Sequence, residues 1–158
     1  MAVIAPEIAL HTSVLASKKN GEITLGVPFM KTRHKKGKGY GAHSFARAKQ
    51  AAERIGVKEI KLLAIGNAED IKDWSGYYAW ATYGFDAPLP TDIIDILPPT
   101  LSKALRLSDL MMTQEGRDFW KAKGGITNMI FNLSPDSPSN KVFEDHKIRN
   151  DYDYREND

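Results

Sequence analysis

The stretch HKKGKGYGAHSFARAKQAAERIG, which runs from His34 to Gly56, decides the fold because it joins a basic, glycine-rich loop directly to a helical pattern. Along residues 42–55 the apolar side chains recur at spacings of three and four, which predicts one face of an amphipathic helix. These apolar residues are Phe45, Ala48, Ala52 and Ile55. Gly56 is suited to end the helix, since glycine commonly follows the last helical turn.

Strands are predicted on both sides of this helix. Upstream, residues 7–17 and 23–33 are rich in apolar and β-branched residues and flank the turn sequence KKNGE, which predicts an antiparallel hairpin. Pro28 cannot donate to a strand ladder, so the second strand is expected to be bulged or to run along an edge there. Downstream, the apolar run at residues 58–66 predicts a strand. The order strand, loop, helix, strand is typical of the right-handed crossover of an α/β or α+β sheet.

The remainder of the chain predicts further short elements. Residues 68–86 favour a helix with an aromatic centre that Gly84 ends, and the four prolines of residues 86–100 favour a loop. A short helix capped by Thr113 and ended by Gly124 should follow, and then a last strand at residues 126–135. We expect residues 1–158 to form a single domain by length, with a polar helix or tail over residues 137–151 and with 144–158 a polar tail prone to disorder.

Composition excludes several classes of function. The chain of 158 residues has a net charge of +2, which is too small to predict nucleic-acid binding by itself, and it has no cysteine. Disulfides, thiolate metal sites and cysteine nucleophiles are therefore excluded. The four histidines are scattered without metal-ligand spacing, so we expect no metal. No window has the roughly 18 continuous apolar residues of a membrane span, and we expect a cytoplasmic protein.

The basic loop from Lys36 to Gly41 has the properties of a phosphate site. Glycine lets the backbone approach an anion closely, and the N-terminus of the following helix offers free N–H groups and the positive end of its dipole. Its G-x-G-x-G spacing differs from both the P-loop and the G-x-G-x-x-G dinucleotide motif. Two other interpretations stay open: a flexible connector with solvated lysines, and a patch for nucleic-acid phosphates.

The segment KGKGYG resembles the loop of the GNAT superfamily of acyl-CoA-dependent N-acetyltransferases, in which a Gln or Arg is followed by x-x-G-x-G/A. The resemblance implies that backbone amides of the loop hold the pyrophosphate of coenzyme A and that the preceding strand binds the pantetheine arm. It also implies acetyl-CoA or another acyl-CoA as co-substrate. The residues matched to coenzyme binding are Met30, Lys31, Lys36, Gly37, Lys38, Gly39, Tyr40 and Gly41.

A second segment, YYAWATYGFD at residues 77–86, is similar to a later GNAT helix with the pattern A-x-x-L-Y-x-x-x-G-F. Together the two segments resemble the central β-α-β-α half of a GNAT domain over residues 23–86. They imply an α+β fold with a single mixed, largely antiparallel sheet. With the later segment TQEGRDFWK, the combination also looks like GNAT-like proteins of bacteriophages and bacteria.

Trp80 stands where the family has the tyrosine that protonates the departing coenzyme A thiolate, and an indole N–H does not titrate usefully. Tyr83 and Tyr77 lie about one helical turn to either side, and Tyr83 is our candidate catalytic acid. The residues that precede Ile23 are too few for the two N-terminal helices that usually shape the acceptor site in the family that the chain resembles. The amine acceptor, a small molecule or a protein, is therefore expected to bind to the C-terminal half or to a second subunit of a homodimer. The alternative is an inactive GNAT-like module that binds nucleic acid or serves in phage assembly.

Overall fold

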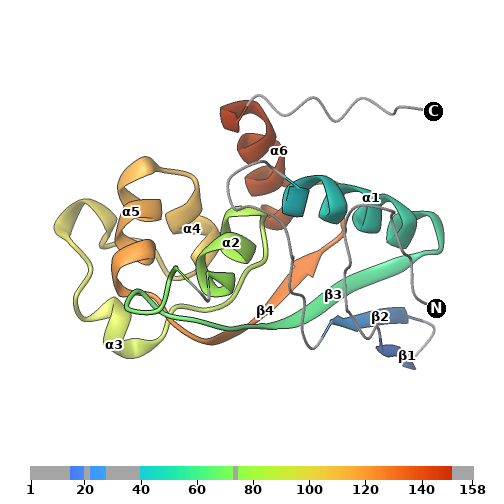
Figure 1. Cartoon of the computed structure of the whole chain (residues 1–158), viewed down its shortest axis with the longest axis horizontal. Helices are drawn as coiled ribbons and strands as arrows, with labels where there is room; N and C mark the ends of the chain where they lie inside the picture. The colour runs from blue at the N-terminus through green and yellow to red at the C-terminus, as the bar shows by residue number, and fades with distance from the viewer. Residues whose placement is uncertain (1–14, 20–21, 28–39, 73–74, 151–158) are drawn as a thin grey trace.

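The computed structural model describes residues 15–19, 22–27, 40–72 and 75–150. Within them a mixed sheet of four strands has the order β1–β2–β3–β4 (Figure 1). β1 (Leu15–Lys19) is antiparallel to β2 (Glu22–Val27), β2 is parallel to β3 (Val57–Ala64), and β3 is antiparallel to β4 (Thr127–Asn132). The predicted α+β class and the mixed sheet with mainly antiparallel pairing are thereby confirmed for these residues.

The parallel pair β2–β3 is joined through helix α1 (Tyr40–Arg54), which lies with α6 over the same side of the sheet (Figure 1). Of the predicted helical face, Phe45 and Ala52 are buried, whereas Ala48 is exposed and Ile55 is 64% exposed beyond the end of the helix. Ala42 is buried on this face instead of Ala48. Gly56 has a φ of 78°, as expected of a glycine that ends a helix. The predicted helix and the strand after it are confirmed to within a few residues.

The antiparallel hairpin at the N-terminal side is confirmed, but its first strand runs further than predicted. β1 continues to Lys19, inside the sequence that predicts a turn, because Lys18 and Lys19 pair with Ile23 and Glu22. The rest of the first predicted strand, residues 7–14, and the predicted irregularity at Pro28 lie outside the described residues.

The chain after β3 forms short helices that gather beyond the end of the sheet (Figure 1). They are α2 (Gly76–Thr82), α3 (Thr91–Ile94), the 3₁₀ turn η1 (Pro99–Leu101), α4 (Leu107–Met111) and α5 (Gln114–Lys123). The predicted short helix with Thr113 as its cap and Gly124 at its end is confirmed as α5, whereas the sequence did not predict α4 just before it. Thr113 has an extended backbone, and its hydroxyl oxygen accepts a hydrogen bond from the Gly116 N–H at 3.0 Å. A residue in that role begins a new helix and cannot continue the previous one.

Helix α6 (Pro138–Asn150) includes residues that the sequence assigned to a polar tail. The Ser137 hydroxyl oxygen accepts the Asn140 N–H at 3.1 Å and caps the helix start. Val142, Phe143 and His146 are buried, so packing against the core holds the helix in place as far as Asn150. Residues 151–158 of the predicted tail lie outside the described residues.

Two contacts fix the turn that follows α2. Gly84 has a φ of 97°, and a Cβ built on it would stand 2.2 Å from the Ser139 carbonyl oxygen of α6. The buried Asp86 carboxylate accepts hydrogen bonds from the Ala87 and Ser108 N–H groups, both at 2.9 Å, and from Arg106 Nε at 2.7 Å. The turn is thus attached to both α6 and α4.

Candidate functional site

The start of α1 is the described part of the predicted coenzyme site. Tyr40 and Gly41 are the first two residues of this helix, and its first turn carries no acidic side chain. The positive end of the helix dipole is therefore not neutralised by a carboxylate of that turn. The other predicted coenzyme-binding residues, namely Met30, Lys31, Lys36, Gly37, Lys38 and Gly39, lie outside the described residues.

Tyr83, the predicted catalytic residue, follows the last turn of α2 and places its hydroxyl group against the start of α1. The hydroxyl oxygen lies 3.0 Å from the position that a Cβ on Gly41 would occupy. The Tyr83 ring is stacked with Phe45 of the same helix, with centroids 6.3 Å apart and an interplanar angle of 9°. The start of α1 and the end of α2, which are far apart in sequence, thus meet in space at Gly41 and Tyr83, and the missing side chain at Gly41 permits the close approach.

Trp80 is packed among aromatic rings beside Tyr83. Its ring centroid lies 5.7 Å from that of Tyr83, 5.3 Å from that of Phe85 and 6.2 Å from that of Phe45, each in an edge-to-face arrangement. Such pairs are favourable because the ring edge is positive and the face negative. Trp80 accordingly stabilises the packing of α2 on α1. Within this aromatic cluster, the hydroxyl group that could donate a proton belongs to Tyr83.

Tyr77, the other tyrosine considered as an acid, has a structural role. It is fully buried, and its hydroxyl donates to the Lys121 carbonyl oxygen at 2.5 Å. Burial, and to a lesser extent Tyr78, raise the pKa of Tyr77. Its carbonyl oxygen also accepts the indole N–H of Trp120 at 2.9 Å. Tyr77 therefore joins α2 to α5, away from the start of α1.

The His146 ring of α6 lies against the Tyr83 ring. The two ring centroids are 5.0 Å apart, with an interplanar angle of 73°. Burial, with the positive charges of Arg149 and Arg117, lowers the pKa of His146 to about 4 against the opposing effect of Asp145. At neutral pH the ring is therefore uncharged. The Asn150 amide Nδ2 lies 3.3 Å from His146 Nδ1, which favours the tautomer with the proton on Nε2.

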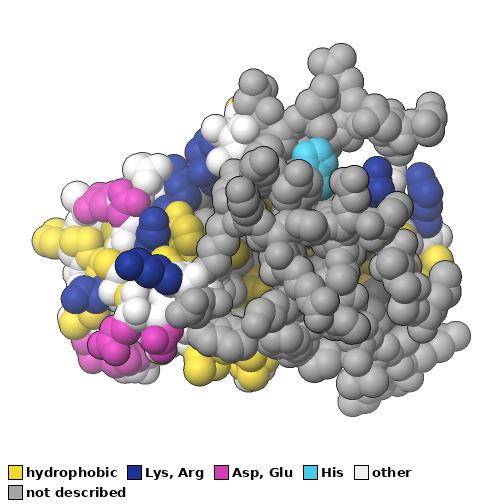
Figure 2. Space-filling view, viewed as in Figure 1, with side chains coloured by type: hydrophobic (Ala, Val, Ile, Leu, Met, Phe, Trp, Pro, Cys, Tyr) yellow, Lys and Arg dark blue, Asp and Glu magenta, His cyan; other side chains and the backbone are white. Residues whose placement is uncertain are grey.

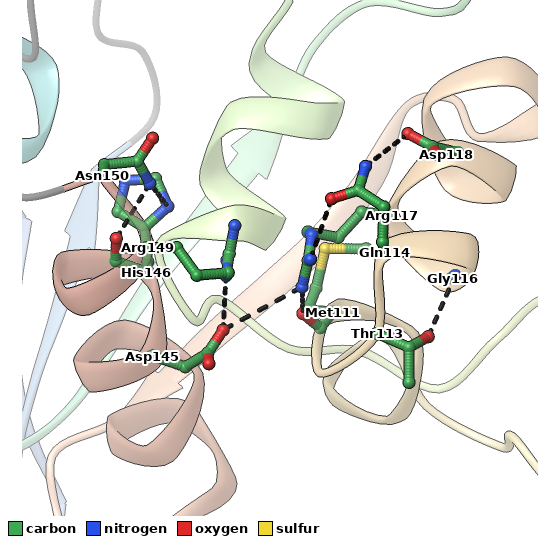
Figure 3. Close-up of polar contacts among 10 residues, drawn as sticks. All are labelled: Met111, Thr113, Gln114, Gly116, Arg117, Asp118, Asp145, His146, Arg149 and Asn150. Atoms are coloured by element: carbon green, nitrogen blue, oxygen red, sulfur yellow. Dashed lines mark hydrogen bonds and ion pairs between the residues drawn. The ribbon is translucent and has the colours of Figure 1, made fainter.

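A polar network between α5 and α6 holds the helix that carries His146 (Figure 3). The buried Arg117 donates from Nη1 to the Met111 carbonyl oxygen at 2.8 Å and from Nη2 to Gln114 Oε1 at 3.0 Å. Asp145 Oδ2 lies 3.9 Å from Arg117 Nη1 and 2.6 Å from Arg149 Nε. Burial, followed by the charge of Arg149, lowers the pKa of Arg117. Two arginines from two helices thus share one carboxylate.

The sequence interpretation missed His146 because it treated residues 144–158 as a polar end. The signal was nevertheless present as a helical spacing. Ser139, Phe143, His146 and Asn150 are separated by four, three and four positions, so they share one face of α6. Since Phe143 on that face is apolar, the spacing could have indicated that His146 is buried beside it.

The described residues give no indication of a metal centre or a membrane span. No group of three or more His, Asp or Glu in this part of the chain could hold a metal ion. None of the described helices combines the length and apolar character needed to cross a bilayer. Comparisons of the chain with models of known families, with curated proteins and with solved structures give no match.

Proposed function

We propose that the chain binds acetyl-CoA or a related acyl-CoA at the start of α1 and transfers the acyl group to an amine acceptor. The observation that carries this proposal is the Tyr83 hydroxyl against Gly41, since it brings a proton donor to the end of the predicted coenzyme loop. The parallel pair β2–β3 joined through α1 supports it, because this arrangement presents the helix N-terminus beyond the end of the first strand.

In this proposal the acceptor amine attacks the thioester carbonyl carbon, and the carbon–sulfur bond then breaks. Tyr83 donates its hydroxyl proton to the departing thiolate, while solvent takes the proton that the amine loses. His146 packs against Tyr83 as an uncharged ring, so it restricts the tyrosine without placing a positive charge beside it.

Titration calorimetry with acetyl-CoA and a thiol-release assay test the proposal. The amines offered are a set of small primary amines and a lysine-containing peptide. Tyr83→Phe should keep coenzyme binding and lower the transfer rate by about 10²-fold or more, the usual contribution of a positioned acid. Tyr78→Phe is the matched control and should leave both unchanged, since Tyr78 is half-buried beside Arg117 and Lys121. No binding heat at millimolar coenzyme would reject the proposal.

A second candidate function is a GNAT-like module that binds nucleic acid or an assembly partner without transfer. The position of Trp80 favours it, because Trp80 stands where the resembled family has the tyrosine that acts as general acid. Its indole ring instead packs against Tyr83 and Phe85. On the face shown in Figure 2, Lys and Arg side chains around the short helices lie between two groups of acidic side chains. The basic residues 31–38, on which nucleic-acid binding is expected to depend, lie outside the described residues.

Salt dependence separates the two functions. Binding of a labelled single-stranded oligonucleotide that weakens steeply with rising salt, together with no thiol release for any amine, would favour the binding module. Coenzyme binding together with thiol release would favour the transferase.

A further inference from the structure

A groove of about 490 Å³ lies between η1, α4 and the first turns of α6. It is separate from the site at Tyr83 because the two use different faces of α6. Pro138, Lys141 and Val142 line the groove, whereas Phe143 and His146 pack on the aromatic cluster. Lys141 and Phe143 are two positions apart, which is about 200° around an α-helix, so Lys141 of the groove lies on the side of α6 opposite to Phe143.

The rim of the groove carries an excess of positive charge. Lys103, Arg106 and Lys141 line it, with Asp109 as the acidic side chain in its lining. Asp109 already accepts the Leu105 and Arg106 N–H groups at 3.0 Å each. Lys103 and Lys141 form no ion pair with any residue that the structure describes. The rim is therefore complementary to more than one carboxylate.

Arg106 can bind a ligand while it keeps its hydrogen bond to Asp86. Its Nε donates to the buried Asp86 at 2.7 Å, yet its side chain is 48% exposed. The terminal amino groups of a guanidinium remain able to donate when Nε is engaged, because the group has five N–H donors in a fixed plane. Asp86 thus orients the guanidinium at the edge of the groove.

The lining of the groove also includes apolar side chains. Among them, Leu101 and Val142 are buried, while Met112 is 48% exposed. Leu105, the neighbour of Arg106 in sequence, is 64% exposed, so apolar surface continues near the groove. Methionine suits such a surface because its flexible thioether adapts to different apolar partners.

We propose that this groove binds a short acidic peptide segment of a partner protein. An apolar side chain of the segment lies against Met112 and Val142, and its carboxylates lie against Lys103, Arg106 and Lys141. A small inorganic anion would leave the apolar side chains of the lining uncovered. A nucleic-acid strand would find no aromatic side chain among the lining residues on which to stack its bases.

Fluorescence anisotropy with a panel of short labelled peptides tests this proposal. In these peptides Asp and Glu alternate with Leu and Phe, and a matched panel carries Asn and Gln at the acidic positions. Members of the acidic panel should bind more tightly than their amide counterparts, and their affinity should fall with salt. The combined change Lys103→Glu and Lys141→Glu should weaken binding by about tenfold, which corresponds to about 1.4 kcal/mol.

Two further variants complete the experiment. Met112→Gln should weaken binding of the acidic panel through loss of the apolar contact. Lys123→Glu, a single charge reversal at an exposed position of α5 outside the groove, should leave it unchanged. Circular dichroism confirms that each variant is folded.

Three results would overturn the proposal: no peptide binds better than its amide counterpart, the lysine reversals have no larger effect than Lys123→Glu, or the peptides fail while another anion binds through the same lysines. Inorganic phosphate and a labelled single-stranded oligonucleotide are the probes for that last case. The proposal does not depend on coenzyme binding, since its residues lie outside the Tyr83 site.

Discussion

Gly84 and Gly56 both have positive φ, but their surroundings differ. A Cβ on Gly84 would lie 2.2 Å from the Ser139 carbonyl oxygen, whereas nothing lies within 4 Å of a Cβ on Gly56. Gly84→Ala should therefore lower the free energy of unfolding by about 3 kcal/mol or more, through steric overlap added to backbone strain. Urea denaturation followed by circular dichroism measures the change.

Gly56→Ala is the control for Gly84→Ala. It carries the strain of a positive φ without the overlap, so it should cost only about 1–2 kcal/mol. Equal losses in the two variants would show that the contact between Gly84 and α6 is not the limiting factor.

His146 should make stability depend on pH. Its pKa is lowered from 6.5 to about 4 in the folded chain, so the unfolded chain binds its proton more readily. The contribution of the uncharged His146 to the free energy of unfolding is therefore fully present above pH 6.5. It decreases as the pH falls toward 4, by about 2–3 kcal/mol. The charged groups that influence the ring are Arg149, Asp145 and Arg117.

Urea midpoints measured from pH 4 to pH 7 test this dependence. His146→Gln should flatten the profile within that window, whatever its effect on overall stability. If the wild-type and variant profiles stay parallel, the buried ring does not cause the pH dependence.

Among the elements, the contact between α5 and α6 depends on one buried arginine. Arg117→Gln removes charge-assisted hydrogen bonds to Met111 and Gln114 and should cost about 2 kcal/mol of unfolding free energy. Arg149→Gln removes a more exposed pair with Asp145, and its cost should stay below about 1 kcal/mol. Thermal unfolding of both variants gives the comparison, and a larger loss for Arg149→Gln would contradict this account.

Helices and strands were predictable where residues within the element itself determine its course and its end. The spacing of Phe45 and Ala52 and the glycine at position 56 predict α1 well, because these signals lie within the helix and its cap. The course of α6 was not predictable in the same way. Its buried residues lie on two faces, toward the groove and toward the aromatic cluster, so no single apolar stripe appears in its sequence.

At the scale of the whole molecule, sheet and helices share one hydrophobic core. The buried cluster includes Phe45 of α1, Phe131 of β4, Leu110 of α4 and Phe143 of α6. We therefore expect a single cooperative unfolding transition, with coincident midpoints by far-ultraviolet circular dichroism and tryptophan fluorescence. Separate midpoints would indicate that the short helices unfold apart from the sheet.

The candidate site was predictable in part. The sequence identifies the glycine loop and Tyr83 separately, because each lies in a recognisable local pattern. The approach of Tyr83 to Gly41 depends on the packing of α2 and α6 around α1, which no local pattern encodes. The resemblance that motivated both assignments implies a function, and the coenzyme experiments above test it.

The edge-to-face contact between Trp80 and Tyr83 gives the protein an intrinsic optical probe. With 5.7 Å between the ring centroids, light absorbed by the phenol can pass to the indole, whose emission responds to the polarity around it. A molecule that displaces Tyr83 from Gly41 would therefore change the fluorescence of Trp80. A change in this emission on addition of acetyl-CoA would test the proposed binding at the start of α1 in the unlabelled chain.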